Sequence, residues 1–329
     1  MLRRAAILLA CAAFLGATCT RALAYVPAPF AQLGYQVRKL ASRLPASDAL
    51  EVLDLSTGYR VGFNAGDSMP AASTIKIPVM VTVFRQLADG RFDLQRRVTL
   101  LERDKDWGSG ELCDAPDGST YSVAELVEKM IEISDNTATN MLIRLVGLRN
   151  VNETMLQLGL EHTRLRDDIR TEGWSIRQEL RTSPDDLVRL LAMMARRQLI
   201  DAWSSNEMIS ILEADQFNSL LPEPLPDDVT IAHKTGSLFD TLNDAGIVYE
   251  NNAPYVIAIM TTGLPSLDLG REFIHTISLL TYNDEHRLAL WREANGFAPF
   301  AFGAGSAPDS SPDFLYWSSA GTQIGTGGG

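Results

Sequence analysis

Apolar residues recur along the chain at two different spacings, which predicts both helices and strands. Residues 32–44 carry apolar side chains at three- and four-residue steps, and this spacing predicts an N-terminal helix. Residues 49–54 and 60–64 are strand-like and flank the turn-forming sequence Ser56-Thr57-Gly58-Tyr59, so they predict a hairpin.

The middle of the chain has the helical spacing in four segments, residues 79–88, 123–133, 140–146 and 184–196. Strand-like segments return at residues 230–233, which lead into Lys234, and at residues 245–250 and 254–262. The sequence Asn251-Asn252 predicts a turn that pairs the last two strands as a hairpin. Residues 271–283 predict a closing helix.

The order of these elements predicts an α+β fold. One antiparallel sheet is built from both ends of the chain and flanked by helices, and an all-helical subdomain is inserted between the two halves. The predicted domain covers residues 25–295, with its α/β part at 25–70 and 222–295 and its helical part at 71–221. Residues 296–329 are rich in Gly, Ser, Ala and Pro and predict a disordered tail, whose aromatic residues Phe314, Tyr316 and Trp317 are able to dock.

The N-terminus has the composition of a secretory signal peptide. Arg3 and Arg4 precede a run of small and apolar residues at 5–17, and Ala22-Leu23-Ala24 supplies the small residues of a cleavage site. We therefore expect cleavage after Ala24 and a periplasmic or secreted protein. The alternative is an uncleaved anchor, but the apolar run is shorter than the roughly 20 residues that a membrane span needs.

Charge and cysteine content narrow the choice of partners. The chain has 29 Lys and Arg against 41 Asp and Glu, a net charge of −12, which disfavours nucleic acid and anionic membranes as ligands. Only Cys113 remains after signal cleavage, so no internal disulfide is expected. The four histidines lack metal-ligand spacing, and we expect no metal or other cofactor. The expected partner of this predicted monomer is a small-molecule substrate, with no stable membrane anchor.

Three short motifs carry the candidate chemistry: Ser73-Thr74-Ile75-Lys76, Ser134-Asp135-Asn136 and Lys234-Thr235-Gly236. The first alone is expected about once per chain by chance, whereas all three in this order are expected in fewer than roughly 1 in 1000 chains. Taken singly, each has an ordinary structural explanation as a helix cap, a turn or the end of a strand.

Ser73 lies close to the predicted start of a helix, where backbone N–H groups favour a developing oxyanion. Lys76 is three residues further on and comes round to the same face. A serine needs a base within hydrogen-bond reach, and a lysine serves only if burial or a second cation lowers its pKa. Lys234 is the candidate for that second cation.

With these motifs, residues 32–282 resemble the class A β-lactamases and the related penicillin-binding transpeptidases. The resemblance implies that Ser73 is acylated, that Lys76 helps to deprotonate it, and that Ser134 relays a proton to the leaving nitrogen. It also places the oxyanion hole on the backbone N–H groups of Ser73 and Ser237.

The resemblance further implies a set of substrate-binding residues. Asn136 is expected to bind the substrate amide, and Lys234, Thr235 and Ser237 its carboxylate. Trp107, just before Gly108-Ser109-Gly110, is either the aromatic wall of the cleft or a plain core or surface aromatic.

The chain departs from the class A pattern in the loop that supplies the deacylating base. The motif Glu-x-x-Leu-Asn is absent from residues 166–181, and its expected position falls near Ile169. Glu172 is the best substitute, and the alternative is that it is an ordinary loop carboxylate. Many class A enzymes also keep an arginine in the region that corresponds to residues 238–249, where this chain has none.

The sequence therefore predicts an exported serine hydrolase that opens cyclic amides through an acyl-enzyme at Ser73, with β-lactams as substrates. One alternative is a penicillin-binding-protein-like enzyme, or an amide or ester hydrolase on the same scaffold, with slow deacylation. Another is a non-catalytic exported binding module.

Overall fold

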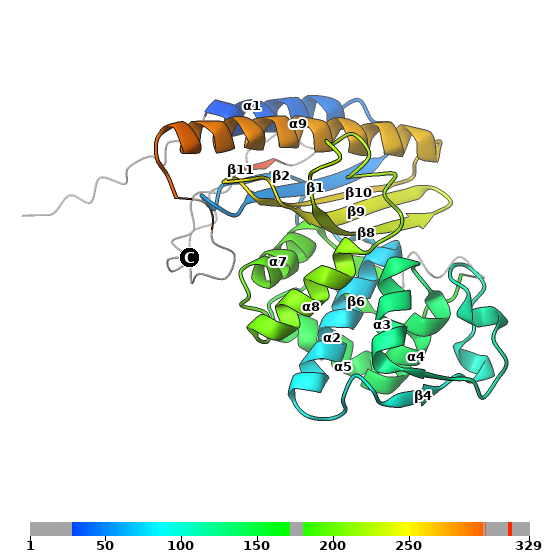
Figure 1. Ribbon diagram of the computed structural model, residues 1–329. Helices are drawn as coiled ribbons and strands as arrows, with labels where there is room; N and C mark the ends of the chain where they lie inside the picture. Colours follow the sequence, from blue (N-terminus) through cyan, green and yellow to red (C-terminus); the bar gives the residue numbers. More distant parts are fainter. Residues whose placement is uncertain (1–27, 172–179, 299, 301–314, 318–329) are drawn as a thin grey trace, which may run out of the picture.

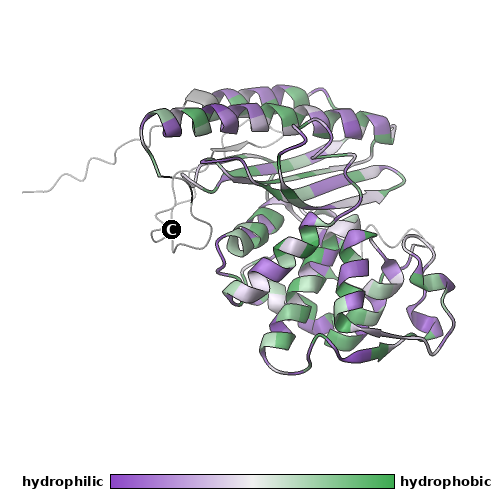
Figure 2. Ribbon diagram, viewed as in Figure 1, coloured by the Kyte–Doolittle hydropathy of each residue, from purple (hydrophilic) through white to green (hydrophobic). Residues whose placement is uncertain are grey.

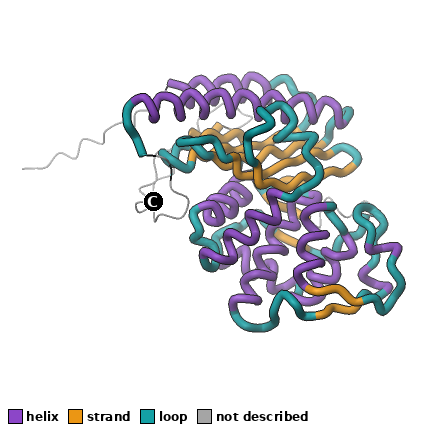
Figure 3. The backbone as a smooth tube through the Cα atoms, viewed as in Figure 1, coloured by secondary structure: helices purple, strands orange, loops and turns teal. Residues whose placement is uncertain are grey.

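A computed structural model describes residues 28–171, 180–298, 300 and 315–317. The predicted signal peptide, residues 1–24, lies outside this range. The predicted α+β architecture is confirmed, since one antiparallel sheet lies as a layer between a pair of helices and a larger helical body (Figures 1 and 3).

The central sheet has six strands in the order β11-β2-β1-β10-β9-β8. Their bounds are β1 Ser47–Asp54, β2 Arg60–Phe63, β8 Ile231–Leu238, β9 Thr241–Val248, β10 Tyr255–Thr262 and β11 Leu315–Trp317. All neighbours pair antiparallel except β11, which runs parallel to β2. The two predicted hairpins, β1–β2 and β9–β10, are both present.

The outer face of the sheet is covered by the first and last helices, α1 Ala28–Ala41 and α9 Leu267–Ala294 (Figure 1). Successive strand residues point to opposite faces, so Leu50 and Val52 of β1 pack in the core beneath these helices while Leu53 packs in the core on the other side. Polar and apolar residues alternate along the α9 ribbon, as expected for a helix with one face on a sheet (Figure 2).

The inner face of the sheet packs against the helical body. Its helices are α2 Lys76–Ala88, α3 Val123–Glu132, α4 Asn136–Val146, α5 Leu148–Gln157, α7 Pro184–Ala195 and α8 Ala202–Glu213. It also contains two short sheets, formed by β3 Met69–Pro70, β6 Arg164–Leu165 and β7 Leu180–Thr182, and by β4 Arg97–Thr99 and β5 Thr120–Ser122.

Helix α7 lies directly against the sheet, and its start follows from the sequence. Ser183 caps the helix by accepting a hydrogen bond from Asp186 N–H, and Pro184 occupies the first turn, where its missing N–H is not needed. Leu187 and Leu191 then point into the same core as Leu53 of β1.

Two helices of the body, α5 and α8, have no counterpart among the predicted elements. In α5 the only buried apolar residues are Val151 and Met155, one pair at a four-residue step, so its periodicity is weak. The closing helix is also longer than predicted. The apolar pattern is interrupted at Asp284 and Glu285, so the sequence predicts an end at residue 283. In the structure both side chains are buried, and the helix runs on to Ala294.

In the predicted tail, Leu315–Trp317 forms β11 on the outer edge of the sheet, beside β2. Two of the aromatic residues expected to dock, Tyr316 and Trp317, belong to this strand. Residues 301–314 and 318–329 lie outside the described range. None of the described helices is both long and apolar enough to cross a membrane.

A buried group of acidic residues lies beneath α9, at the end of the sheet where β1 ends and β10 begins. Glu285 is fully buried, and neither of its carboxylate oxygens has a hydrogen-bond partner in the described structure. Burial, with the nearby charges of Asp54 and Glu250, raises the pKa of Glu285 well above its ordinary value. The folded protein therefore favours the protonated form of this side chain.

We expect Glu285→Gln to stabilise the protein in a pH-dependent way. Because the folded-state pKa is raised, the stability associated with this group is present at low pH and is lost as the pH rises. At pH 8 the substitution should raise the free energy of unfolding by about 1–3 kcal/mol, because an uncharged amide avoids the additional penalty that an ionisable group incurs on burial at this pH. At pH 5 the gain should be much smaller. Urea unfolding at both pH values measures the difference, and the exposed Glu272→Gln on the same helix is the control.

Candidate functional site

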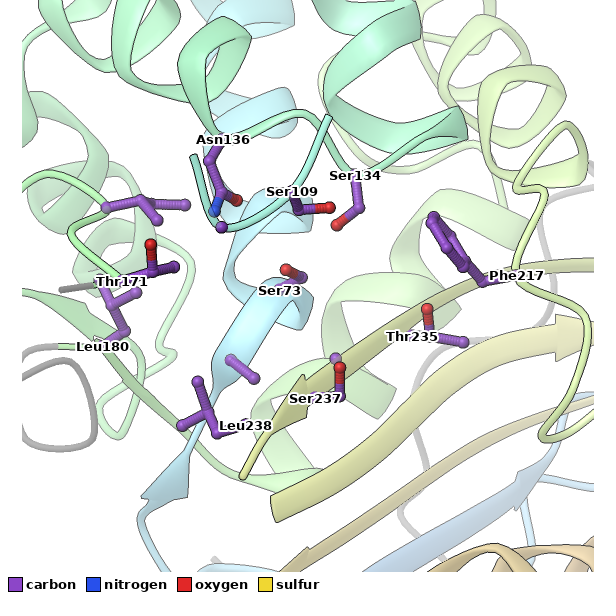
Figure 4. Close-up of a pocket in the computed structure, with 14 residues that line it drawn as sticks. Ser73, Ser109, Ser134, Asn136, Thr171, Leu180, Phe217, Thr235, Ser237 and Leu238 are labelled. Carbon is purple, nitrogen blue, oxygen red and sulfur yellow. The ribbon is translucent and has the colours of Figure 1, made fainter. Parts of the chain in front are cut away.

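A pocket opens between β8 and the helical body, and all three sequence motifs meet in it (Figure 4). Ser73 lies near its centre, with Ser134 on the helical side and Thr235 and Ser237 on the strand side. The pocket is lined by Ala72, Ser73, Gly108, Ser109, Ser134, Asn136, Ile169, Thr171, Leu180, Phe217, Thr235, Gly236, Ser237 and Leu238.

Ser73 is placed by a short 3₁₀ turn, Ala72–Ile75, that leads directly into α2. The turn begins with Ala72 at φ 48°, in the left-handed region that non-glycine residues rarely adopt. Such strain persists where the surrounding structure enforces it, and it is frequent at functional sites. Within the described residues no hydrogen bond occupies Ser73 Oγ, which leaves the hydroxyl available to a ligand in the pocket.

Lys76 is the first residue of α2 and is fully buried. Its ammonium donates three hydrogen bonds, to Ser134 O at 2.6 Å, Ser134 Oγ at 2.9 Å and Asn136 Oδ1 at 2.7 Å. Burial and the charge of Lys234 lower the pKa of Lys76 well below its ordinary value. Burial and a second cation are the two causes that allow a lysine to act as a base.

Lys234 lies on β8 and is also fully buried, but it has a carboxylate partner. Its Nζ lies 3.0 Å from Asp215 Oδ2 and 5.5 Å from the ring centroid of Phe217. Asp215 additionally accepts a hydrogen bond from Phe217 N–H. Burial lowers the pKa of Lys234, while Asp215 opposes this shift.

The strand β8 approaches the backbone of Ser73 so closely that only glycine fits at position 236. A Cβ on Gly236 would lie 2.9 Å from Ser73 N and 3.0 Å from Ala71 O, both backbone atoms that cannot swing aside. From the neighbouring strand, Asn243 Nδ2 donates to Pro70 O and Ala71 O. These contacts fix the chain that precedes Ser73 against the sheet.

The second motif forms the turn between α3 and α4. Ser134 has φ 54°, which directs both its carbonyl and its hydroxyl toward Lys76. Asp135 caps α4 through Ala138 N–H and also accepts from Glu111 N–H and Leu112 N–H. Asn136, in the first turn of α4, is thereby aimed at the pocket.

The structure brings together seven of the predicted site residues: Ser73, Lys76, Ser134, Asn136, Lys234, Thr235 and Ser237. Trp107 is 61% exposed and is not among the lining residues, although the adjacent Gly108 and Ser109 are. The aromatic residue in the wall is Phe217, which the sequence analysis did not identify.

Glu172, the suggested deacylating base, lies outside the described residues. From the described part of its loop, Ile169 and Thr171 line the pocket, whereas Asp167 and Asp168 do not. Two further carboxylates near the site, Asp106 and Asp215, were also missed. Neither belongs to a motif, and no local spacing connects them to one.

Comparison with known proteins gives a consistent assignment. A family model described as "Beta-lactamase2: Beta-lactamase enzyme family" matches residues 33–284. The chain is 30% identical over 247 residues to a beta-lactamase of Streptomyces albus G, an alignment that covers 68% of this chain and 76% of that protein.

Solved structures are similar over most of the described chain. PBP-A has a TM-score of 0.73 and 32% identity, with coverage of 78% of this chain and 96% of PBP-A. A PBP-A variant with a leucine replaced by glutamate, in an acyl-enzyme complex with penicillin G, has a TM-score of 0.74. A beta-lactamase from Sphaerobacter thermophilus has a TM-score of 0.72 and 29% identity, with coverage of 77% and 97%.

We expect Gly236→Ala to destabilise the protein, because its Cβ must push β8 away from the backbone of Ser73 and Ala71. Overpacking of this kind costs about 1–3 kcal/mol. Gly66→Ala is the matched control, since its Cβ would meet no atom within 4 Å, and its effect should stay within about 0.5 kcal/mol. Chemical denaturation of both variants measures the contrast, and equal effects would contradict the close-approach argument.

Proposed function

The chain belongs to the beta-lactamase enzyme family, and we propose that it is a serine hydrolase that β-lactams acylate at Ser73. The observation that carries the proposal is the state of Lys76. This lysine is buried, its pKa is lowered, and its Nζ is hydrogen-bonded to Ser134 Oγ at the wall of the pocket that Ser73 lines. A neutral amine in this position is the base that a serine nucleophile needs.

In the proposed acylation, neutral Lys76 takes the proton of Ser73 Oγ as this oxygen bonds to the lactam carbonyl carbon. The negative charge on the carbonyl oxygen is stabilised by the backbone N–H groups of Ser73 and Ser237. When the carbon–nitrogen bond breaks, Ser134 Oγ gives its proton to the leaving nitrogen and receives the proton held by Lys76. The 2.9 Å contact between Lys76 Nζ and Ser134 Oγ supports this last transfer.

The strand side of the pocket supports binding of an anionic substrate. Thr235 and Ser237 line the pocket, and Lys234, which precedes them on the same strand, carries a buried charge paired with Asp215. A substrate carboxylate can bind the two hydroxyl groups and be attracted by the ammonium. Asn136, on the opposite wall, is placed to bind the substrate amide.

The described loop supports slow release of the acyl group. A deacylating water needs a base within hydrogen-bond reach, yet the described loop contributes Ile169 and Thr171 to the pocket. This observation favours a second candidate function, a penicillin-binding-protein-like enzyme with a long-lived acyl-enzyme. The similarity to PBP-A, whose variant was captured as an acyl-enzyme with penicillin G, agrees with it.

We also propose that the protein is exported. This part of the proposal rests on the sequence of residues 1–24 alone.

A fluorescent penicillin is expected to label the folded protein covalently, and Ser73→Ala should abolish the labelling. Lys76→Arg should abolish it as well, because arginine keeps the charge but cannot lose its proton. The labelling rate of the wild type should rise with pH as Lys76 loses its proton. Ser109→Ala is the control, since Ser109 lines the same pocket outside the motifs. A folded wild type that takes up no label would refute the proposal.

Ile169→Glu is expected to shorten the lifetime of the acyl-enzyme. A carboxylate at this wall of the pocket can activate a water, and general-base catalysis contributes at least about a hundredfold in well-arranged sites. We expect a gain of about tenfold or more, measured as the loss of bound label with time. Ile169→Gln is the control, because glutamine has nearly the same shape as glutamate but no basic group. It should leave the lifetime of the acyl-enzyme as it is in the wild type. Equal lifetimes in the two variants would contradict a role for this wall.

A further inference from the structure

Asp106 lies behind the pocket, on the loop that follows β4, and only 4% of it is exposed. Its carboxylate contacts both the second motif and the loop at residue 171, although Asp106 itself does not line the pocket. We propose that Asp106 is a positioning residue that orients the Asn136 amide toward Lys76 and fixes Thr171 in the pocket wall. This inference rests on the proposed acylation at Ser73.

Two hydrogen bonds set the orientation of the Asn136 amide. Its Nδ2 donates to Asp106 Oδ1 at 2.7 Å, and its Oδ1 accepts from Lys76 Nζ at 2.7 Å. An amide can be turned end for end, and its neighbours decide which end faces which way. An ionised carboxylate only accepts hydrogen bonds, so Asp106 requires Nδ2 on its own side. The amide oxygen is then directed at Lys76.

Asp106 also holds Thr171 in the pocket wall. Thr171 donates to Asp106 from its backbone N–H at 2.8 Å and from its hydroxyl at 2.9 Å, and Gly108 N–H adds a further bond at 3.0 Å. Position 108 also packs tightly, since a Cβ there would lie 2.2 Å from Thr171 Cγ2. The Asp106 carboxylate therefore connects Asn136 of the second motif with Thr171 of the loop.

Asp106 also acts on Lys76 through its negative charge. Burial tends to raise the pKa of Asp106, but hydrogen bonds from Thr171, Asn136 and Gly108 outweigh it and lower the pKa. The carboxylate is thus ionised at neutral pH. Its negative charge is one of those that raise the pKa of Lys76, against burial and Lys234. Loss of this charge should make Lys76 give up its proton at lower pH.

The test is Asp106→Asn, which keeps the size of the side chain but adds donor groups and removes the charge. The amide of Asn136 then loses the neighbour that fixes its orientation, and Thr171 loses acceptors. We expect acylation by a fluorescent penicillin at pH 7 to slow by at least about tenfold, a loss typical of a misplaced catalytic neighbour. The rise of the rate with pH should move to lower pH.

A second readout does not depend on activity. The chain has lysines only at positions 39, 76, 105, 129 and 234, so lysine ¹³Cε NMR resolves few signals, and Lys76→Ala identifies the one of interest. In Asp106→Asn the Lys76 signal should titrate at lower pH than in the wild type.

Asp104→Asn is the matched control. Asp104 lies two residues before Asp106 in the sequence and is equally buried, at 3% exposed. Its carboxylate pairs with Arg144 and not with a residue of the pocket. It should leave both the acylation rate and the Lys76 titration unchanged. The proposal is overturned if Asp106→Asn acylates within twofold of the wild type and titrates identically, or if both variants shift Lys76 alike. If the wild type takes up no penicillin, the proposed function fails, and the titration still decides the role of Asp106.

Discussion

Two lysine ammonium groups, those of Lys76 and Lys234, are buried beside one another where the sheet meets the helical body. Water no longer solvates either charge, so the protein must replace that solvation with its own groups. Lys234 obtains a carboxylate, Asp215. Lys76 obtains three uncharged oxygens instead and, among the described residues, no ion pair. The turn at Ser134 supplies two of those oxygens at once, its carbonyl and its hydroxyl, so the second motif provides most of the solvation that Lys76 has lost.

Lys234 has a carboxylate partner and Lys76 has only uncharged oxygen partners, so the two lysines differ in how strongly each holds its proton. A carboxylate at 3.0 Å stabilises the charged form of Lys234, so this residue suits the binding of an anion. Lys76 has only uncharged oxygens as hydrogen-bond partners, and burial and the charge of Lys234 lower its pKa more than the nearby carboxylates raise it. One site thus contains a lysine suited to accept a proton and another suited to remain charged. Asp215 is fully buried and belongs to no motif, yet the difference between the two lysines depends on it as much as on the lysines themselves.

The sequence was sufficient for the parts of the site that local spacing encodes. Ser73 and Lys76 share a helical turn, and the period of a strand puts Thr235 and Ser237 on the pocket side of β8. The missed residues act over longer separations: Asp215 binds Lys234 across 19 residues, and Asp106 binds Asn136 across 30 and Thr171 across 65. Such contacts depend on how elements pack and leave no periodic signal. The length of α9 was missed for a related reason, since its buried Asp284 and Glu285 look like surface residues in a sequence.

Acylation and deacylation need different groups in the pocket. The described walls contain the groups proposed to act in acylation, which are anchored by the sheet and by α4, whereas the loop side of the pocket is formed in part by Ile169 and Thr171. There, Asn140 fixes the backbone of Ile169 through both its N–H, at 2.8 Å, and its carbonyl, at 3.0 Å. The direction of this 3% exposed side chain is therefore set, and an isoleucine offers water no hydrogen bond. Two hydrogen bonds to its backbone and the packing of its side chain in the hydrophobic core together hold Ile169 in the wall. An apolar side chain fixed in this wall agrees with the slow release of the acyl group that we propose.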